Sequence, residues 1–111
     1  ALQVAEYLVG HPRVRRVNHP ALAADPRLVE RQLRGFSGTF SFELDTDEFD
    51  RVARVVDGLR RFRIGVSWGG VESLVLSPAR RHAPSPLIRL SIGLEGADLL
   101  IEDLDRALEA A

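Results

Sequence analysis

The spacing of apolar positions changes along the chain, and each spacing predicts a different element. Residues 2–9 repeat apolar side chains at helical intervals until Gly10 stops the pattern, so they predict the end of a helix. Residues 14–17 predict a short strand, and residues 19–26 predict a loop. A second helix is expected over residues 26–34, because a proline suits the first helical turn.

From Phe36 the period changes to two, which predicts a half-buried strand that ends at Leu44. Thr46 follows and can cap a helix whose first turn is acidic. One apolar stripe marks that helix: Phe49, Val52, Ala53, Val56 and Leu59. Two arginines, Arg60 and Arg61, close it near its negative end. This is the clearest helical pattern in the chain.

The second half of the chain returns to short apolar runs. Residues 64–66 and 71–76 predict strands, and residues 77–86 form a proline-rich loop. Residues 87–94 then alternate again: Ile88, Leu90, Ile92 and Leu94 share one face, and Leu87, Arg89, Ser91 and Gly93 share the other. A closing amphipathic helix is expected from Ala97. Strands alternating with helices predict a small two-layer α/β sandwich with a largely antiparallel sheet.

Composition excludes several kinds of site. The 111 residues suit one domain, the formal net charge is −1, and no apolar run approaches the roughly 20 residues that span a bilayer. Acids and bases are interspersed, which argues against a nucleic-acid surface. The sequence has no Cys and no Lys, so thiolate sites and Schiff bases are excluded, and a reducing compartment such as the cytoplasm fits. The three histidines lack metal-ligand spacing, so no metal site is expected.

The acidic residues of the helices and turns are expected to serve as solvated faces or as partners of the helix dipoles. The set comprises Asp47, Glu48, Asp50, Asp103 and Asp105. Within the last helix, Glu102 and Arg106 are spaced for an i,i+4 ion pair.

Arg89 is the most informative single residue, because it lies in the middle of a strand whose alternate positions are apolar. Its side chain must therefore leave the sheet on the second face, where Ser91 and Gly93 are small. A rigidly mounted guanidinium with space beside it suits bidentate binding of a carboxylate or phosphate. The simpler alternative is a surface arginine paired with an acidic residue.

The segment GVSWGGVES, residues 65–73, allows two interpretations. Its paired glycines permit close backbone approach, Ser67 offers a hydroxyl, and Trp68 could form the wall of a pocket. Alternatively, the glycines form a plain turn and Trp68 fills the core.

Three blocks together carry a family resemblance: RGFSGTFSFEL, FRIGVSWGGVESLVLSPA and LIRLSIGLEGADLLIEDLDRALEAA. In order and spacing they resemble the C-terminal domain of the Cys/Met-metabolism (transsulfuration) family of pyridoxal-phosphate enzymes. The upstream run VAEYLVGHPRVRRVNHPAL resembles the interdomain helix and the segment after it, so residues 1–10 would end that helix. The resemblance covers essentially all 111 residues and implies a fold-type I small domain, with helices on one face of the sheet.

The resemblance also implies roles for particular residues. Arg89 would bind the α-carboxylate of an amino-acid substrate, and Ser67 would lie beside that carboxylate. Val66 and Trp68 would line the pocket for the substrate side chain. The catalytic lysine and the pyridoxal 5'-phosphate site belong to the larger N-terminal domain. The chain is therefore expected to be a fragment that is inactive alone, and its parent enzyme a homotetramer.

The segment SWGG resembles bacterial cystathionine β-lyases, which implies β-elimination of cystathionine. Val66 departs from the Glu of many γ-acting members and from the Tyr of some β-lyases. A γ-acting enzyme (methionine γ-lyase, cystathionine γ-lyase or γ-synthase) therefore stays an alternative. Two others are a free-standing amino-acid-binding regulatory domain anchored by Arg89 and a purely structural or oligomerisation module.

Overall fold

The computed structural model describes residues 2–22, 27, 38–65 and 72–111. Its elements, in chain order, are α1 (Leu2–Val9), β1 (Val14–Asn18), the 3-10 turn η1 (Pro20–Leu22), β2 (Thr39–Leu44), α3 (Phe49–Gly58), β3 (Arg63–Ile64), β4 (Leu74–Leu76), β5 (Leu87–Ser91) and α4 (Ala97–Ala110). The helix expected over residues 26–34 and the strand start at Phe36 fall outside the described residues, apart from residue 27.

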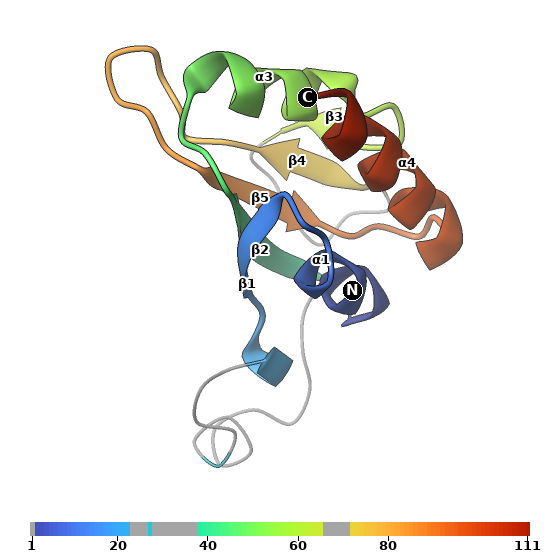
Figure 1. The fold of residues 1–111 in the computed structure, drawn as a ribbon. Coiled ribbons are helices and arrows are strands. Elements are labelled where there is room, and N and C mark those ends of the chain that lie inside the picture. The colour runs from blue at the N-terminus through green and yellow to red at the C-terminus, as the bar shows by residue number, and fades with distance from the viewer. Residues whose placement is uncertain (1, 23–26, 28–37, 66–71) are drawn as a thin grey trace.

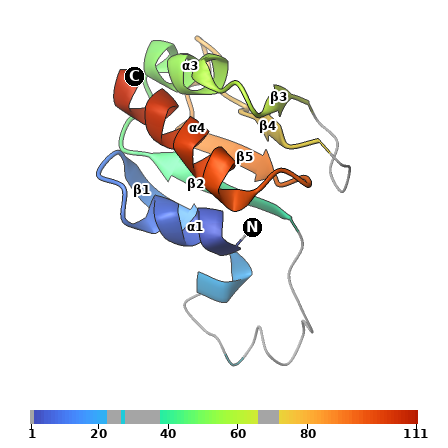
Figure 2. The same cartoon turned by 90° about the vertical axis from the view of Figure 1, so that its right-hand side faces the viewer.

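One five-stranded sheet, in the order β1-β2-β5-β4-β3, forms the first layer. Its pairs are antiparallel except β3 with β4, which run parallel. The three helices α1, α3 and α4 lie together over one face of the sheet, as Figures 1 and 2 show. The predicted fold class is confirmed: a two-layer α/β sandwich with a largely antiparallel sheet.

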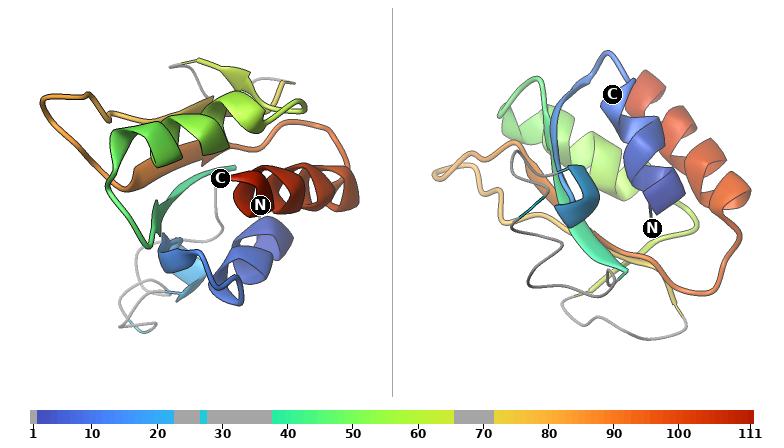
Figure 3. Two further views of the ribbon diagram at one scale, coloured as in Figure 1. Left: turned by 45° about the horizontal axis from the view of Figure 1, so that its top comes forward. Right: turned by 90° about the horizontal axis from the view of Figure 1, so that it is seen from below.

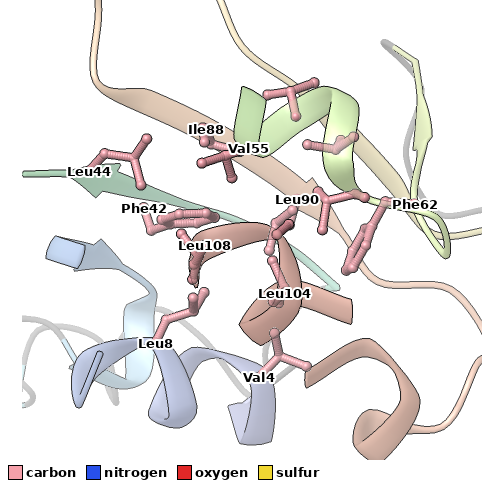
Figure 4. Packing of buried hydrophobic residues seen from close by; sticks show 14 of the residues in the cluster. Val4, Leu8, Phe42, Leu44, Val55, Phe62, Ile88, Leu90, Leu104 and Leu108 are labelled. Carbon is pink, nitrogen blue, oxygen red and sulfur yellow. The ribbon is translucent and has the colours of Figure 1, made fainter. Parts of the chain in front are cut away.

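The core fills the space between the two layers. In β2 the burial alternates strictly, so Phe40, Phe42 and Leu44 face the helices. The register places Phe42 opposite Ile88 and Phe40 opposite Leu90, and side chains paired in this way share a face of the sheet. Leucines and valines of the helices close over them (Figure 4). The apolar residues that alternate along the strands and those that repeat along the helices therefore pack into a single core.

A buried carboxylate joins α3 and α4, contrary to the expectation that Asp103 is solvated or a partner of the helix dipole. Asp103 is 5% exposed and accepts hydrogen bonds from the backbone N–H groups of Arg60 (2.9 and 3.0 Å) and Arg61 (2.7 Å), directly after α3. Arg106 donates both to Asp103 (2.7 Å) and to the carbonyl of Gly58 (2.6 Å). Arg106 therefore pairs at i,i+3 with Asp103 instead of with the expected partner Glu102, which is exposed.

Helix α1 packs along α4, as the two views of Figure 3 show. The Tyr7 hydroxyl donates a 2.6 Å hydrogen bond to Asp105 across this contact. Burial, reinforced by the nearby Asp105 carboxylate, raises the pKa of Tyr7 above its ordinary value. Asp105 is thus a partner of Tyr7 across this contact, while its side chain stays 48% exposed, in keeping with the expectation of a solvated acid.

Several element ends differ from the sequence pattern. Strand β4 starts at Leu74, whereas the pattern placed residues 72 and 73 in the strand as well, and β3 is Arg63–Ile64 where residues 64–66 were expected. Strand β5 ends at Ser91, three residues before the predicted end, so Leu94 lies outside the strand and is 81% exposed. Helix α3 starts at Phe49, and the Thr46 hydroxyl accepts from the N–H of Glu48 before the helix begins. Among the described residues, no helix has the length and apolar character needed to cross a membrane, and no cluster of potential metal ligands occurs.

Because of His19, the stability of the fold is expected to depend on pH. The residue is 3% exposed, and its ring accepts at Nδ1 from the N–H of Ala21 (3.1 Å) and packs edge-on against Phe40. Burial lowers the pKa of His19 below its ordinary value of 6.5, so the folded state disfavours the protonated ring. Its contribution to stability is therefore complete above about pH 6.5 and is lost as the pH falls through the lowered pKa.

We expect the free energy of unfolding by urea to fall between pH 7.5 and pH 5.5, and to fall less in His19→Gln. His82→Gln, at an exposed histidine, serves as the control and should behave like the unsubstituted chain. Equal losses in the His19 variant and the unsubstituted chain would contradict this assignment.

Candidate carboxylate-binding face

The sheet face opposite the helices carries a row of four residues in register. Asn18 pairs with Ser41, Ser41 with Arg89, and Arg89 with Leu76, so the row crosses four neighbouring strands. Paired residues project from the same side of a sheet. Because Ile88 and Leu90 project into the core on either side of Arg89, this row lies on the helix-free face. The predicted orientation of Arg89 agrees with this register.

The backbone that carries Arg89 is held firmly. Strand β5 is the middle strand of the sheet and pairs with β2 on one edge and β4 on the other. Its two flanking residues, Ile88 and Leu90, are completely buried. Arg89 itself is partly buried. A guanidinium on such a platform loses little freedom on binding an oxyanion, because the backbone and the base of the side chain are already fixed.

Polar side chains lie next to Arg89 along this row. Asn18 donates a 3.1 Å hydrogen bond from Nδ2 to the Ser41 hydroxyl, which stands beside Arg89 in the register. A serine oxygen that accepts one bond can still donate its own proton. Glu43, which lies two residues after Ser41 in β2, forms a 2.8 Å ion pair with Arg15. The row therefore combines a cation with hydroxyl and amide groups, which suits recognition of a carboxylate.

The other residues of the predicted site have different outcomes. Val66, Ser67 and Trp68 lie outside the described residues, so their predicted roles stay predictions. The space expected beside Arg89 is only partly present. Ser91 is 3% exposed, flanked in register by Thr39 and Leu74, and Gly93 lies beyond the end of β5.

A serine–glutamate pair at the end of β5 was not predicted from the sequence. The Ser73 hydroxyl donates to Glu95 Oε2 (2.7 Å) and accepts from the N–H of Gly93 (2.9 Å). Donation by Ser73 lowers the pKa of Glu95 below its ordinary value. Twenty-two residues separate the two partners, and each has an ordinary local explanation, Ser73 in a glycine-rich turn and Glu95 before a helix. The one sequence feature that could have indicated this pair is the position of Ser73, directly before the apolar run of β4.

The family model described as Cys/Met metabolism PLP-dependent enzyme matches residues 1–109. Cystathionine beta-lyase MetC of Escherichia coli is 41% identical over 95% of this chain, and cystathionine gamma-lyase of Bacillus subtilis is 37% identical over 98%. The chain covers 30% and 32% of these two relatives, so it spans about a third of their length.

A solved structure extends the likeness to three dimensions. The chain aligns with the cystathionine gamma synthase of Xanthomonas oryzae, crystallised in complex with cystathionine, with a TM-score of 0.85 and 40% identity. The alignment covers 98% of this chain and 32% of that one. Residue pattern, fold and sequence identity agree, and the chain belongs to the Cys/Met metabolism family of pyridoxal-phosphate-dependent enzymes.

Proposed function

We propose that residues 1–111 form the C-terminal, substrate-carboxylate-binding domain of a larger pyridoxal-phosphate-dependent C–S lyase. The observation that carries the proposal is the place of Arg89, in the middle strand of the sheet and on the face that no described helix covers. The family supports an amino-acid substrate, and an amino acid offers an α-carboxylate to such a guanidinium.

The chain does not supply the cofactor site by itself. Pyridoxal phosphate acts as an electron sink for bonds at the substrate Cα. The enzymes that use it hold it through a lysine Schiff base, and this sequence contains no lysine. The residues of this chain therefore bind and orient the substrate, and bond cleavage is assigned to the rest of the protein. We propose accordingly that the chain is inactive alone and that the complete enzyme is a cytoplasmic homotetramer.

Orientation is the contribution that these residues make to the reaction. Arg89 would bind both oxygens of the α-carboxylate, and Ser67 would donate to one of them. Two-point binding fixes the direction in which the Cα–H bond points, and such positioning is a large part of what an active site contributes to rate. Val66 and Trp68 would contact the substrate side chain and so decide which leaving group is accepted.

For the reaction we propose β-elimination of cystathionine to homocysteine, pyruvate and ammonia. The SWGG segment and the 41% identity to the Escherichia coli beta-lyase support it. The γ-acting relatives at 37% and 40% identity are the alternative. The complete polypeptide should release pyruvate from L-cystathionine in equal amount with homocysteine. Release of 2-oxobutyrate and cysteine would overturn β-elimination in favour of γ-elimination.

Trp68→Leu should change the choice among substrates. A smaller, more flexible side chain removes a rigid aromatic wall, so the ratio of kcat/KM for L-cystathionine to that for L-methionine should shift by about 10-fold, the effect of roughly 1.4 kcal/mol in a side-chain pocket. Steady-state rates with both substrates measure the ratio, and an unchanged ratio would remove Trp68 from the specificity wall.

A further inference from the structure

We propose that Ser73 and Glu95 form a positioning pair, which holds β4 and the end of β5 together and thereby sets the surroundings of Arg89. The inference rests on the proposed function, because it assigns to the pair an effect on carboxylate binding. Neither residue is expected to touch the substrate.

The pair makes a compact set of hydrogen bonds. Both carboxylate oxygens of Glu95 accept from Ser73, Oε2 from the hydroxyl (2.7 Å) and Oε1 from the backbone N–H (3.4 Å). The same hydroxyl accepts from the N–H of Gly93 at 2.9 Å. Ser73 is completely buried, and a buried hydroxyl is tolerated when its bonds are satisfied. The turn from Gly93 to Glu95 is thereby fastened to the residue that precedes β4.

Ser73 also binds on its other side. Its carbonyl accepts from the N–H of Arg63 (2.9 Å), and two residues later Val75 accepts from the N–H of Gly65 (3.1 Å). Gly65, the described residue directly before residues 66–71, and Ser73, the second described residue after them, are therefore both tied by backbone hydrogen bonds between the β3 and β4 segments. The sequence between these two residues contains Ser67, the proposed second carboxylate contact.

The bonds at the end of β5 act on Arg89 through the register. Leu74 pairs with Ser91, and Leu76 pairs with Arg89. A shift of β4 along β5 would therefore move Leu76 relative to Arg89. On the opposite edge, Ile92 donates to the carbonyl of Gly38 (2.8 Å), where a Cβ on Gly38 would approach the Ile92 oxygen to 2.8 Å. With β2 held close at Gly38, the Ser73–Glu95 pair adds a side-chain connection on the β4 side, beyond the last pair of the β4–β5 ladder.

The experiment compares Ser73→Ala with the unsubstituted enzyme, using the complete polypeptide with bound pyridoxal phosphate and L-cystathionine as substrate. We expect KM to rise about 5- to 20-fold, because the variant loses a hydrogen bond to a charged group, with kcat changed less than 2-fold. Glu95→Gln should raise KM less, about 3- to 5-fold, since an amide oxygen still accepts from the hydroxyl. If Ser73→Ala does not fold, this second variant alone carries the test.

Tyr7→Phe is the matched control, because it removes one equally short side-chain hydrogen bond (2.6 Å), placed between α1 and α4. Its KM should stay within 2-fold. Hydrogen exchange should show that the amide of Gly93 loses protection in Ser73→Ala, while the amide of Ile92 keeps it. Added to Arg89→Ala, Ser73→Ala should raise KM less than 2-fold further, since both act on one carboxylate contact.

A KM change in Ser73→Ala no larger than that of Tyr7→Phe, with the Gly93 amide exposed, would overturn the inference and leave the pair purely structural. This outcome is distinct from failure of the proposed function. If the proposed function were wrong, Arg89→Ala itself would leave KM for L-cystathionine unchanged.

Discussion

Replacing Arg89 with alanine in the complete polypeptide is expected to raise KM for L-cystathionine about 10- to 150-fold. The reason is loss of a charge-assisted bidentate pair, worth roughly 1.5–3 kcal/mol. Steady-state kinetics over a wide range of substrate concentration measure the effect. Arg89→Lys should recover little of the loss, because an ammonium group keeps the charge without the planar fork.

Arg54→Ala provides the control for Arg89. It removes an exposed arginine from α3, in the helical layer, and should leave KM within 2-fold. An effect of Arg89→Ala that is no larger than the control would remove Arg89 from the carboxylate site.

Asp103→Ala should cause the largest loss of stability among the polar substitutions considered. Asp103 is the acceptor for two consecutive backbone N–H groups after α3 and for Arg106. Removing it deprives these part-buried donors of a charged acceptor, and a hydrogen bond to a charged group contributes about 1.5–3 kcal/mol. We expect the free energy of unfolding, measured with urea, to fall by about 2–4 kcal/mol.

Asp98→Ala is the matched control, since it removes an exposed carboxylate from the first turn of the same helix. Loss of a favourable interaction with the helix dipole costs about 0.3–1 kcal/mol. Equal losses in the two variants would show that the Asp103 hydrogen bonds add nothing beyond an ordinary surface charge.

Periodicity predicted most of the described elements because each signal is local. The alternation in Thr39–Leu44 and Leu87–Ser91 predicted two central strands, and through them the face from which Arg89 projects. The same alternation extended the second strand too far, to Leu94. The spacing of apolar residues cannot predict the hydrogen bonds that Ser73 makes with Gly93 and Glu95, just after the strand ends at Ser91.

The polar contacts that organise the molecule were beyond sequence reasoning for a related reason. Asp103 and Arg60 are separated by 43 residues, and each has an ordinary local interpretation, as a helical acid and as a basic residue at a helix end. Their pairing appears only when α3 and α4 pack together. A carboxylate at a buried helical position looks like any other helical carboxylate until its partners are placed.

Some features of the candidate site were also predictable from the sequence, and others were not. The alternation of one strand predicted the orientation of Arg89, and its neighbours on the face follow from the sheet order. Asn18 and Ser41 come from strands distant in the sequence and were not predicted to lie beside it. The roles of Ser67, Trp68 and Val66 come from the family resemblance, because neither spacing nor composition distinguishes a binding turn from a plain one.

A crystal structure of the complete polypeptide with a bound, unreactive L-amino acid tests the central claim most directly. The account predicts that both α-carboxylate oxygens lie about 2.7–2.9 Å from guanidinium nitrogens of Arg89, the spacing of a charge-assisted fork. A carboxylate held by other residues, with the Arg89 guanidinium more than about 4 Å away and beyond ion-pair distance, would contradict it.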